Sequence, residues 1–107
     1  MEWTFITSEY AVAPQINVED LQKIVEAGFK SIINNRPDGE EPDQPSSASL
    51  EAAVRAQGLE YAYNPVAPSG LSEENIANIK GQMSVLPKPI LAFCRTGNRS
   101  TILFKNL

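Results

Sequence analysis

The sequence predicts a three-layer α/β domain in which a central, mostly parallel sheet carries helices on both faces. Short apolar runs of strand length alternate along the chain with amphipathic segments of helix length. Such alternation is typical of βαβ units, in which each helix crosses back over the sheet. The chain has 107 residues, of which 42% are hydrophobic and 21% charged. It is therefore expected to form a single domain over residues 1–107, either alone or as a fragment of a longer protein.

The individual elements follow from periodicity and from cap residues. The apolar runs that predict strands are residues 3–6, 10–12, 29–33, 59–64 and 89–93. The segments that predict helices are residues 17–28, 46–58 and 72–86, with the beginning of a last helix at 100–104. Asn17 and Ser72 are expected to be N-caps, because acidic residues follow them in the first turn. Gly28 and Gly58 are placed where a glycine typically ends a helix.

Composition excludes several classes of site and partner. The chain has no histidine, which excludes zinc sites and Ser-His or Cys-His catalysis within it. Its net charge of −4 argues against nucleic acid or an acidic membrane as a partner. A single cysteine, no visible signal peptide and no membrane-length apolar run together predict a cytoplasmic protein. No metal and no cofactor is implied, and the oligomeric state stays open.

The most informative segment is Cys-Arg-Thr-Gly-Asn-Arg-Ser at residues 94–100, which holds the only cysteine. Cys94 lies between a buried strand and the expected start of a helix, where unpaired backbone N–H groups and the helix dipole favour a thiolate. Arg95 and Arg99 add positive charge, and the guanidinium of Arg99 matches the geometry of a tetrahedral oxyanion. Cys94 is thus the predicted nucleophile and Arg99 its catalytic partner. The remaining predicted binding residues of the loop are Thr96, Gly97, Asn98 and Ser100.

Each of these roles has a plainer alternative. Cys94 can be an inert buried cysteine, which is common for a lone thiol. Arg99 can be one half of a surface ion pair, and Ser100 can simply cap the last helix.

Three loops leave the carboxyl ends of the predicted strands, where α/β sheets bind their ligands. They are residues 34–45, residues 65–70 and the cysteine loop, and we expect them to converge. The first loop contributes Arg36 as a binding residue and Asp38 as a catalytic acid. The alternative is that Asp38, which precedes a glycine, only organises a turn.

The cysteine loop resembles two known groups of enzymes. Tyrosine and dual-specificity phosphatases use a cysteine, five residues and an arginine, whereas rhodaneses use a six-residue loop. Four residues separate Cys94 from Arg99, which is the rhodanese count. Residues 28–36 nevertheless resemble a strand of dual-specificity phosphatases. The wider combination resembles the bacterial phosphatase-like domain of the DUF442 family, found alone or fused to beta-lactamase-like hydrolases. The segments that carry this resemblance are Pro14-Gln15, residues 34–40, Tyr61 with Pro65-Val66, and residues 94–100.

The resemblance implies a protein-tyrosine-phosphatase-like fold, with two departures. Phosphatases usually have histidine before the cysteine, where this chain has Phe93, and an aspartate general acid in a loop equivalent to residues 64–70, which has none here. Loss of a general acid typically lowers the rate by ~10²–10⁴. The acidic residues that could replace it are Asp38, Glu40, Glu41 and Asp43. The two glutamates are expected to face solvent.

The loop length and the missing acid favour sulfur transfer, because sulfite or a thiolate leaves without a proton donor. Cys94 would carry the sulfane sulfur as a persulfide. The alternative is a phosphatase that works through a phosphocysteine, and the further alternative is an anion-binding module without turnover. The expected partners are correspondingly a phosphate ester, thiosulfate or a persulfide.

Overall fold

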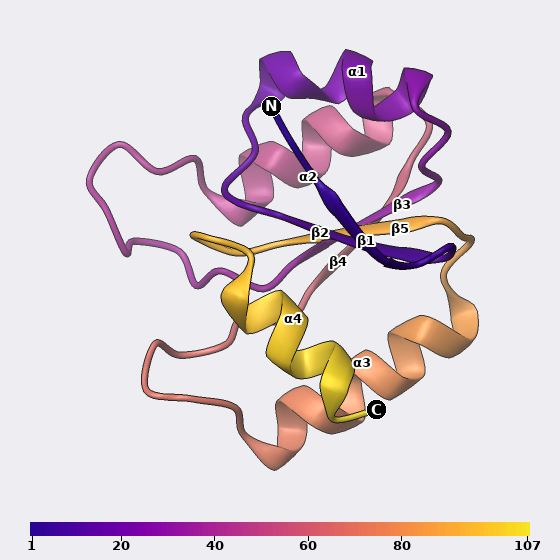
Figure 1. Ribbon diagram of the computed structural model, residues 1–107. Coiled ribbons are helices and arrows are strands. Elements are labelled where there is room, and N and C mark those ends of the chain that lie inside the picture. Colours follow the sequence, from indigo (N-terminus) through magenta and orange to yellow (C-terminus); the bar gives the residue numbers. More distant parts are fainter.

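The computed structural model describes residues 1–107 and arranges five strands in one sheet with the order β1-β2-β5-β3-β4 (Figure 1). The strands are β1 (Thr4–Thr7), β2 (Tyr10–Ala13), β3 (Ser31–Asn34), β4 (Glu60–Tyr63) and β5 (Ile90–Phe93). Strand β1 is antiparallel to β2, whereas β2, β5, β3 and β4 run parallel to one another. The predicted mostly parallel sheet is therefore confirmed.

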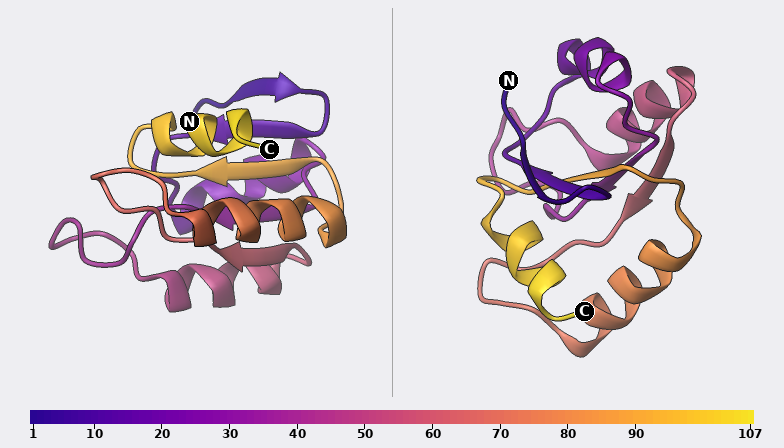
Figure 2. Two further views of the ribbon diagram at one scale, coloured as in Figure 1. Left: turned by 90° about the horizontal axis from the view of Figure 1, so that it is seen from below. Right: turned by 45° about the vertical axis from the view of Figure 1, so that its right-hand side comes forward.

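Helices cover both faces of this sheet. They are the 3₁₀ helix η1 (Val18–Asp20) and the α-helices α1 (Leu21–Glu26), α2 (Ser47–Ala56), α3 (Glu73–Val85) and α4 (Asn98–Lys105). Helices α1 and α2 pack on one face, and α3 and α4 on the other (Figures 1 and 2). The predicted three layers are confirmed. No helix in the structure combines the length and the apolar character that a bilayer crossing requires.

The central strand β5 shows how the two cores form. Leu91 and Phe93 point into the core beneath α1 and α2, whereas Ile90 and Ala92 point into the core beneath α3 and α4. Successive side chains of a strand point to opposite faces, so a strand covered on both sides is apolar throughout. All four residues are buried completely. Because β5 is buried between the two cores, the position of the next residue, Cys94, is fixed as well.

The helix ends agree with their predicted caps. The Ser72 hydroxyl accepts the N–H of Asn75 at 3.1 Å, and the Asn17 N–H donates to the Asp20 carboxylate at 2.8 Å. The first turn after Asn17 is a 3₁₀ turn rather than α-helix. The last helix begins two residues earlier than residue 100, because Gly97 turns the chain into helical geometry immediately before Asn98.

The functional loops all leave one edge of the sheet. The parallel strands end at this edge, and the chain continues into loops at residues 35–46, 64–72 and 94–97. Figure 2 shows the three loops projecting from the same end of the molecule. Their predicted convergence is confirmed.

Candidate active site

Cys94 sits at the start of a tight turn that places its sulfur at the N-terminus of α4. Its side chain is fully buried, and the Gly97 N–H donates to Sγ at 3.1 Å. The Cys94 N–H donates to the Ala13 carbonyl at 3.4 Å, which anchors the turn to β2. Gly97 has a φ of 96°, a left-handed conformation that side-chain-bearing residues rarely adopt. A backbone N–H aimed at the sulfur, together with the helix dipole, stabilises a thiolate.

Arg99 lies in the first turn of α4 and is held by a second loop. Its Nη1 and Nη2 donate to the two carboxylate oxygens of Glu40 at 2.7 and 2.9 Å, and Nη1 also donates to the Val66 carbonyl at 2.7 Å. These bonds use three of the five guanidinium donors. The Nε–H and one N–H of Nη2 remain, and they form one edge of the guanidinium. That edge is the forked donor pair that suits an oxyanion.

The side chain of Arg99 also lies close to that of Cys94. The Glu40 hydrogen bond is the largest cause that raises the pKa of Arg99, and the charge of Cys94 raises it further. The predicted nucleophile Cys94 and the predicted anion-binding residue Arg99 are thus brought together by the start of one helix.

Glu40 bridges two arginines. Its Oε1 accepts both from Arg99 and from the Nε of Arg36, at 2.8 Å for the latter. The hydrogen bond from Arg99, with a smaller contribution from Arg36, lowers the pKa of Glu40 to about 2. Its side chain is only 14% exposed. The expectation that Glu40 faces solvent is therefore wrong, because Arg99, which binds both of its oxygens, lies 59 positions away and no local pattern indicates that pairing.

Arg36 lines the site, but each of its three nitrogens already has a protein partner. Besides Glu40, it donates to the Oε1 of Gln15 at 3.0 Å and to the Oε1 of Glu41 at 2.7 Å. Its side chain is buried. Arg36 thus joins the loop at residues 35–46 to the end of β2. Glu41 faces solvent more than Glu40 does, with 47% of its side chain exposed.

Asp38 has a different setting from the one expected of a catalytic acid. Its Oδ1 accepts the N–H of Ser47 at 2.7 Å, at the start of α2, and its own N–H donates to the Tyr63 hydroxyl at 2.9 Å. It does not line the cavity beside Arg99. The geometry matches the alternative in which Asp38 organises the loop. Asp43 lines a separate cavity of about 200 Å³.

Ser100 takes part in a buried polar network that sequence reasoning missed. Its hydroxyl donates to the Oδ1 of Asn35 at 2.9 Å, so its proton is directed at an amide rather than at Cys94. Asn35 donates in turn to the Asn64 carbonyl at 3.1 Å, and Asn75 donates to the Asn64 side chain at 2.8 Å. The network joins the three loops. Its only sequence signal was asparagine directly after two apolar strands.

The loops enclose a cavity of about 460 Å³ in front of α4. Its lining residues are Arg36, Glu40, Glu41, Pro68, Arg95 and Arg99. Three arginines and two glutamates give this wall a net charge of +1, in a chain of net charge −4. A small anionic molecule fits such a wall best.

Four predicted binding residues, Thr96, Gly97, Asn98 and Ser100, do not line this cavity, and neither does the fully buried Cys94. Thr96 and Asn98 line another one, of about 370 Å³, beside the N-terminal strands together with Gly97. The Asn98 N–H donates to the Thr96 hydroxyl oxygen at 3.3 Å, which stabilises the turn. The structure therefore brings Arg36, Arg95 and Arg99 together on one wall and turns Thr96 and Asn98 to another.

Comparison with known families agrees with this architecture over nearly the whole chain. The sequence profile of the family "Beta-lactamase hydrolase-like protein, phosphatase-like domain" matches residues 2–106. A beta-lactamase hydrolase-like protein of Agrobacterium fabrum is 35% identical over 99 residues, which cover 92% of this chain. A protein of the same description from Xylella fastidiosa is 33% identical over the same length. The chain spans about a quarter, 23%, of the length of each of these relatives.

Solved structures share the fold. A candidate phosphatase from Neisseria meningitidis is 28% identical with a TM-score of 0.87, and the match covers 94% of this chain and 72% of that one. A DUF442 candidate phosphatase from Shewanella putrefaciens has a TM-score of 0.81 at 19% identity, over 96% of this chain and 64% of that one. The core catalytic domain of a PP-IP phosphatase from S. cerevisiae has a TM-score of 0.68 at 18% identity, over 94% and 60%. The predicted phosphatase-like scaffold is confirmed.

Proposed function

Because the chain belongs to the family of phosphatase-like domains of beta-lactamase hydrolase-like proteins, we propose that it is a cysteine-dependent phosphatase for a small phosphate ester. One observation carries the proposal. The Gly97 amide that faces Cys94 Sγ and the unpaired edge of Arg99 both belong to the start of α4. A nucleophile and a forked oxyanion donor at one helix N-terminus are what phosphoryl transfer requires. Phosphatase activity differs from the sulfur transfer that the length of the cysteine loop favours.

The reaction proceeds in two steps. The Cys94 thiolate attacks phosphorus, an S–P bond forms, and the ester P–O bond breaks as the leaving oxygen takes a proton. Arg99 and the loop amides stabilise the phosphoryl oxygens during this transfer. Water then attacks the phosphocysteine, so that the S–P bond breaks and inorganic phosphate is released with the thiolate restored.

The proton for the leaving group comes from the cavity wall. Of the four acidic residues that the sequence offers, only Glu40 and Glu41 line the cavity. Glu40 is held as a carboxylate by two arginines, with its pKa lowered to about 2, so it is a poor donor. Glu41 is half-exposed, and both of its arginine partners, Arg36 and Arg95, bind the same oxygen, so its Oε2 has no protein partner. We assign it the role that the sequence suggested for Asp38.

Sulfur transfer is the second candidate, supported by the four residues between Cys94 and Arg99. In that reaction the Cys94 thiolate attacks the sulfane sulfur of thiosulfate, an S–S bond forms and sulfite leaves. A thiol acceptor then takes the sulfur and restores the thiolate. No acid is needed at either step.

Hydrolysis of p-nitrophenyl phosphate by the purified chain tests the proposal, with Cys94→Ser as the control. We expect turnover by the parent and none by the variant. Mass spectrometry after incubation with thiosulfate separates the second candidate, because a persulfide on the Cys94 thiolate adds about 32 Da, the mass of one sulfur atom. That adduct without phosphate release would overturn hydrolysis. Anion binding with neither activity would indicate a non-catalytic module.

A further inference from the structure

We propose that Arg95 forms a second anion-binding point beside Arg99, so that the preferred substrate carries a second anionic group next to the reacting phosphoryl. The inference rests on the proposed function, because it takes Arg99 as the residue that binds the phosphoryl group. It adds the chemical class of the substrate, which the fold does not give.

The arginines of the cavity differ in whether they keep a nitrogen without a protein partner. Arg36 has a protein partner on every nitrogen, namely Gln15, Glu40 and Glu41. Arg95 has one protein partner, at 3.4 Å between its Nε and the Oε1 of Glu41. Two guanidinium groups of the cavity therefore keep nitrogens without a protein partner, namely Nη1 and Nη2 of Arg95 and Nε of Arg99. A single phosphoryl group on Arg99 leaves the first of these without an anion.

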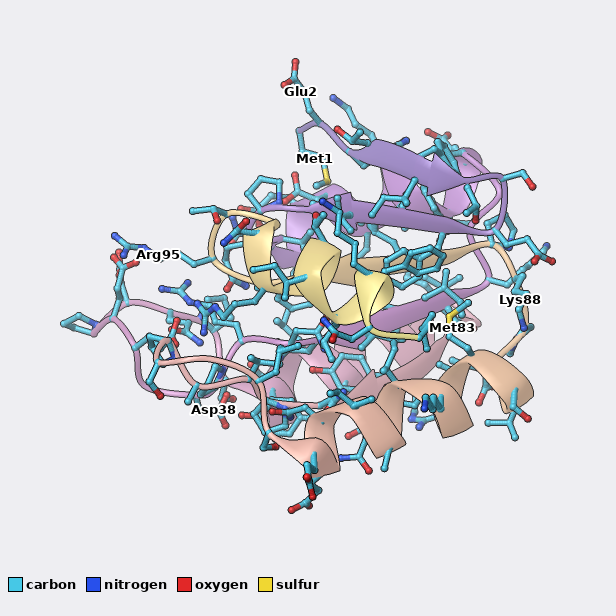
Figure 3. All side chains as sticks on the ribbon, turned by 60° about the horizontal axis from the view of Figure 1, so that its bottom comes forward. Met1, Glu2, Asp38, Met83, Lys88 and Arg95 are labelled. Atoms are coloured by element: carbon cyan, nitrogen blue, oxygen red, sulfur yellow. The ribbon has the colours of Figure 1, made fainter.

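Arg95 has a fixed backbone and an exposed side chain. Its backbone is fixed, because its carbonyl accepts the N–H of Gln15 at 3.3 Å and the preceding residue is the buried Cys94. Its side chain is 65% exposed and projects from the loop end of the molecule (Figure 3). A fixed base with an exposed guanidinium suits a group that binds a ligand at the rim of the cavity. Asp38, on a different loop, projects elsewhere at this end (Figure 3).

The cavity has room for more than one phosphoryl group. The cavity measures about 460 Å³. It can hold many groups of the size of a water molecule, which takes about 30 Å³ of liquid volume. A lone phosphoryl group leaves most of this space to solvent. Pro68 is the only lining residue without a charge. The remaining space is therefore suited to a polar, anionic part of the substrate rather than to an apolar leaving group.

Binding of two stable anions tests the proposal without turnover. The probes are methylphosphonate, with one anionic group, and methylenediphosphonate, with two adjacent ones. Binding is measured by calorimetry on the parent chain and on Arg95→Ala. We expect the substitution to weaken methylenediphosphonate about fivefold, the upper range for an exposed ion pair. Binding of methylphosphonate should change less than twofold, since an exposed arginine that it does not contact contributes little.

Arg55→Ala is the matched control, because Arg55 is also an exposed arginine but pairs with Glu51 and Glu60 away from the cavity. It removes the same charge and should leave both affinities unchanged. Glu41→Gln should strengthen methylenediphosphonate, because it frees Arg95 and removes a negative charge from the rim. Equal weakening of both probes by Arg95→Ala would overturn the second binding point, as would no weakening of either.

Failure of the proposed function has a different signature. Absence of p-nitrophenyl phosphate hydrolysis, with the difference between the two probes intact, would contradict the phosphatase but keep the subsite. Hydrolysis together with identical binding of the two probes by the parent would contradict the subsite but keep the phosphatase.

Discussion

Two of the three loops around the cavity are held in opposite ways. The loop at residues 94–97 is fixed by its backbone, through Cys94 on Ala13 and Gly97 on the sulfur. The loop at residues 35–46 is fixed by side chains, chiefly the three bonds of Arg36 and the bond from Ser47 to Asp38. The position of the nucleophile therefore depends on main-chain geometry next to the sheet, whereas the cavity wall depends on a network of charged side chains.

The largest expected effect comes from straining the backbone-held loop. Gly97→Ala forces a side chain into a left-handed conformation, which costs about 1–2 kcal/mol, and shifts the amide that faces Cys94. We expect kcat for p-nitrophenyl phosphate to fall about 10²-fold, the cost of one oxyanion-type donor. Gly39→Ala is the control, because Gly39 is also left-handed, with a φ of 77°, but lies in the other loop. A similar loss of kcat in both variants would contradict the distinction between the loops.

The next effect tests the proton donor on the side-chain-held loop. Glu41→Gln should lower kcat for phenyl phosphate by about 10²-fold, since general acid help is worth that much for a poor leaving group. It should change kcat little for p-nitrophenyl phosphate, whose leaving group needs no proton. The ratio of the two rates, measured at one pH, is the readout. An equal fall for both substrates would show that Glu41 acts through binding rather than as an acid.

Removing the Glu40 carboxylate that bridges the two arginines should lower the free energy of unfolding. Glu40→Gln leaves the buried Arg36 and the mostly buried Arg99 without a shared carboxylate. Breaking a buried ion pair from one side typically costs about 3–5 kcal/mol, and the partial exposure of Glu40 places the expected loss nearer 2 kcal/mol. Urea unfolding of the parent and the variant measures it. An unchanged midpoint would mean that Glu40 contributes nothing to the loop.

The same carboxylate predicts how stability depends on pH. The pKa of Glu40 is lowered from 4.5 to about 2 in the folded chain. Its contribution is therefore present above pH 4.5 and is lost as the pH falls toward 2, because the unfolded state takes up the proton first. Urea midpoints are measured between about pH 5 and pH 2.5, a range chosen from these two pKa values. With decreasing pH they should fall less steeply in Glu40→Gln than in the parent. Parallel slopes would contradict the ion pair.

Much of the fold could be predicted because its signals are local. The alternating apolar runs, the caps at Asn17 and Ser72 and the convergence of three loops all depend on neighbouring residues. The pairing of Arg99 with Glu40 could not be predicted, because two adjacent glutamates look equally solvent-exposed in sequence. Nor could the direction of the Ser100 hydroxyl, which the buried Asn35 determines. Such contacts join side chains that lie far apart in the sequence, and no local sequence pattern indicates them.

The smallest expected effect is also the sharpest test of the side-chain-held loop. Asp38→Ala removes the oxygen that accepts the Ser47 N–H at the start of α2, and replacing such an acceptor at a helix start by alanine costs about 1 kcal/mol. Because Asp38 does not line the cavity, the ratio of phenyl phosphate to p-nitrophenyl phosphate turnover should stay at the parent value. Glu41→Gln should move that ratio and leave the urea midpoint nearly unchanged. A reversal of these two results would make Asp38 the proton donor after all, and the loop would have to bend over Arg99 to bring it there.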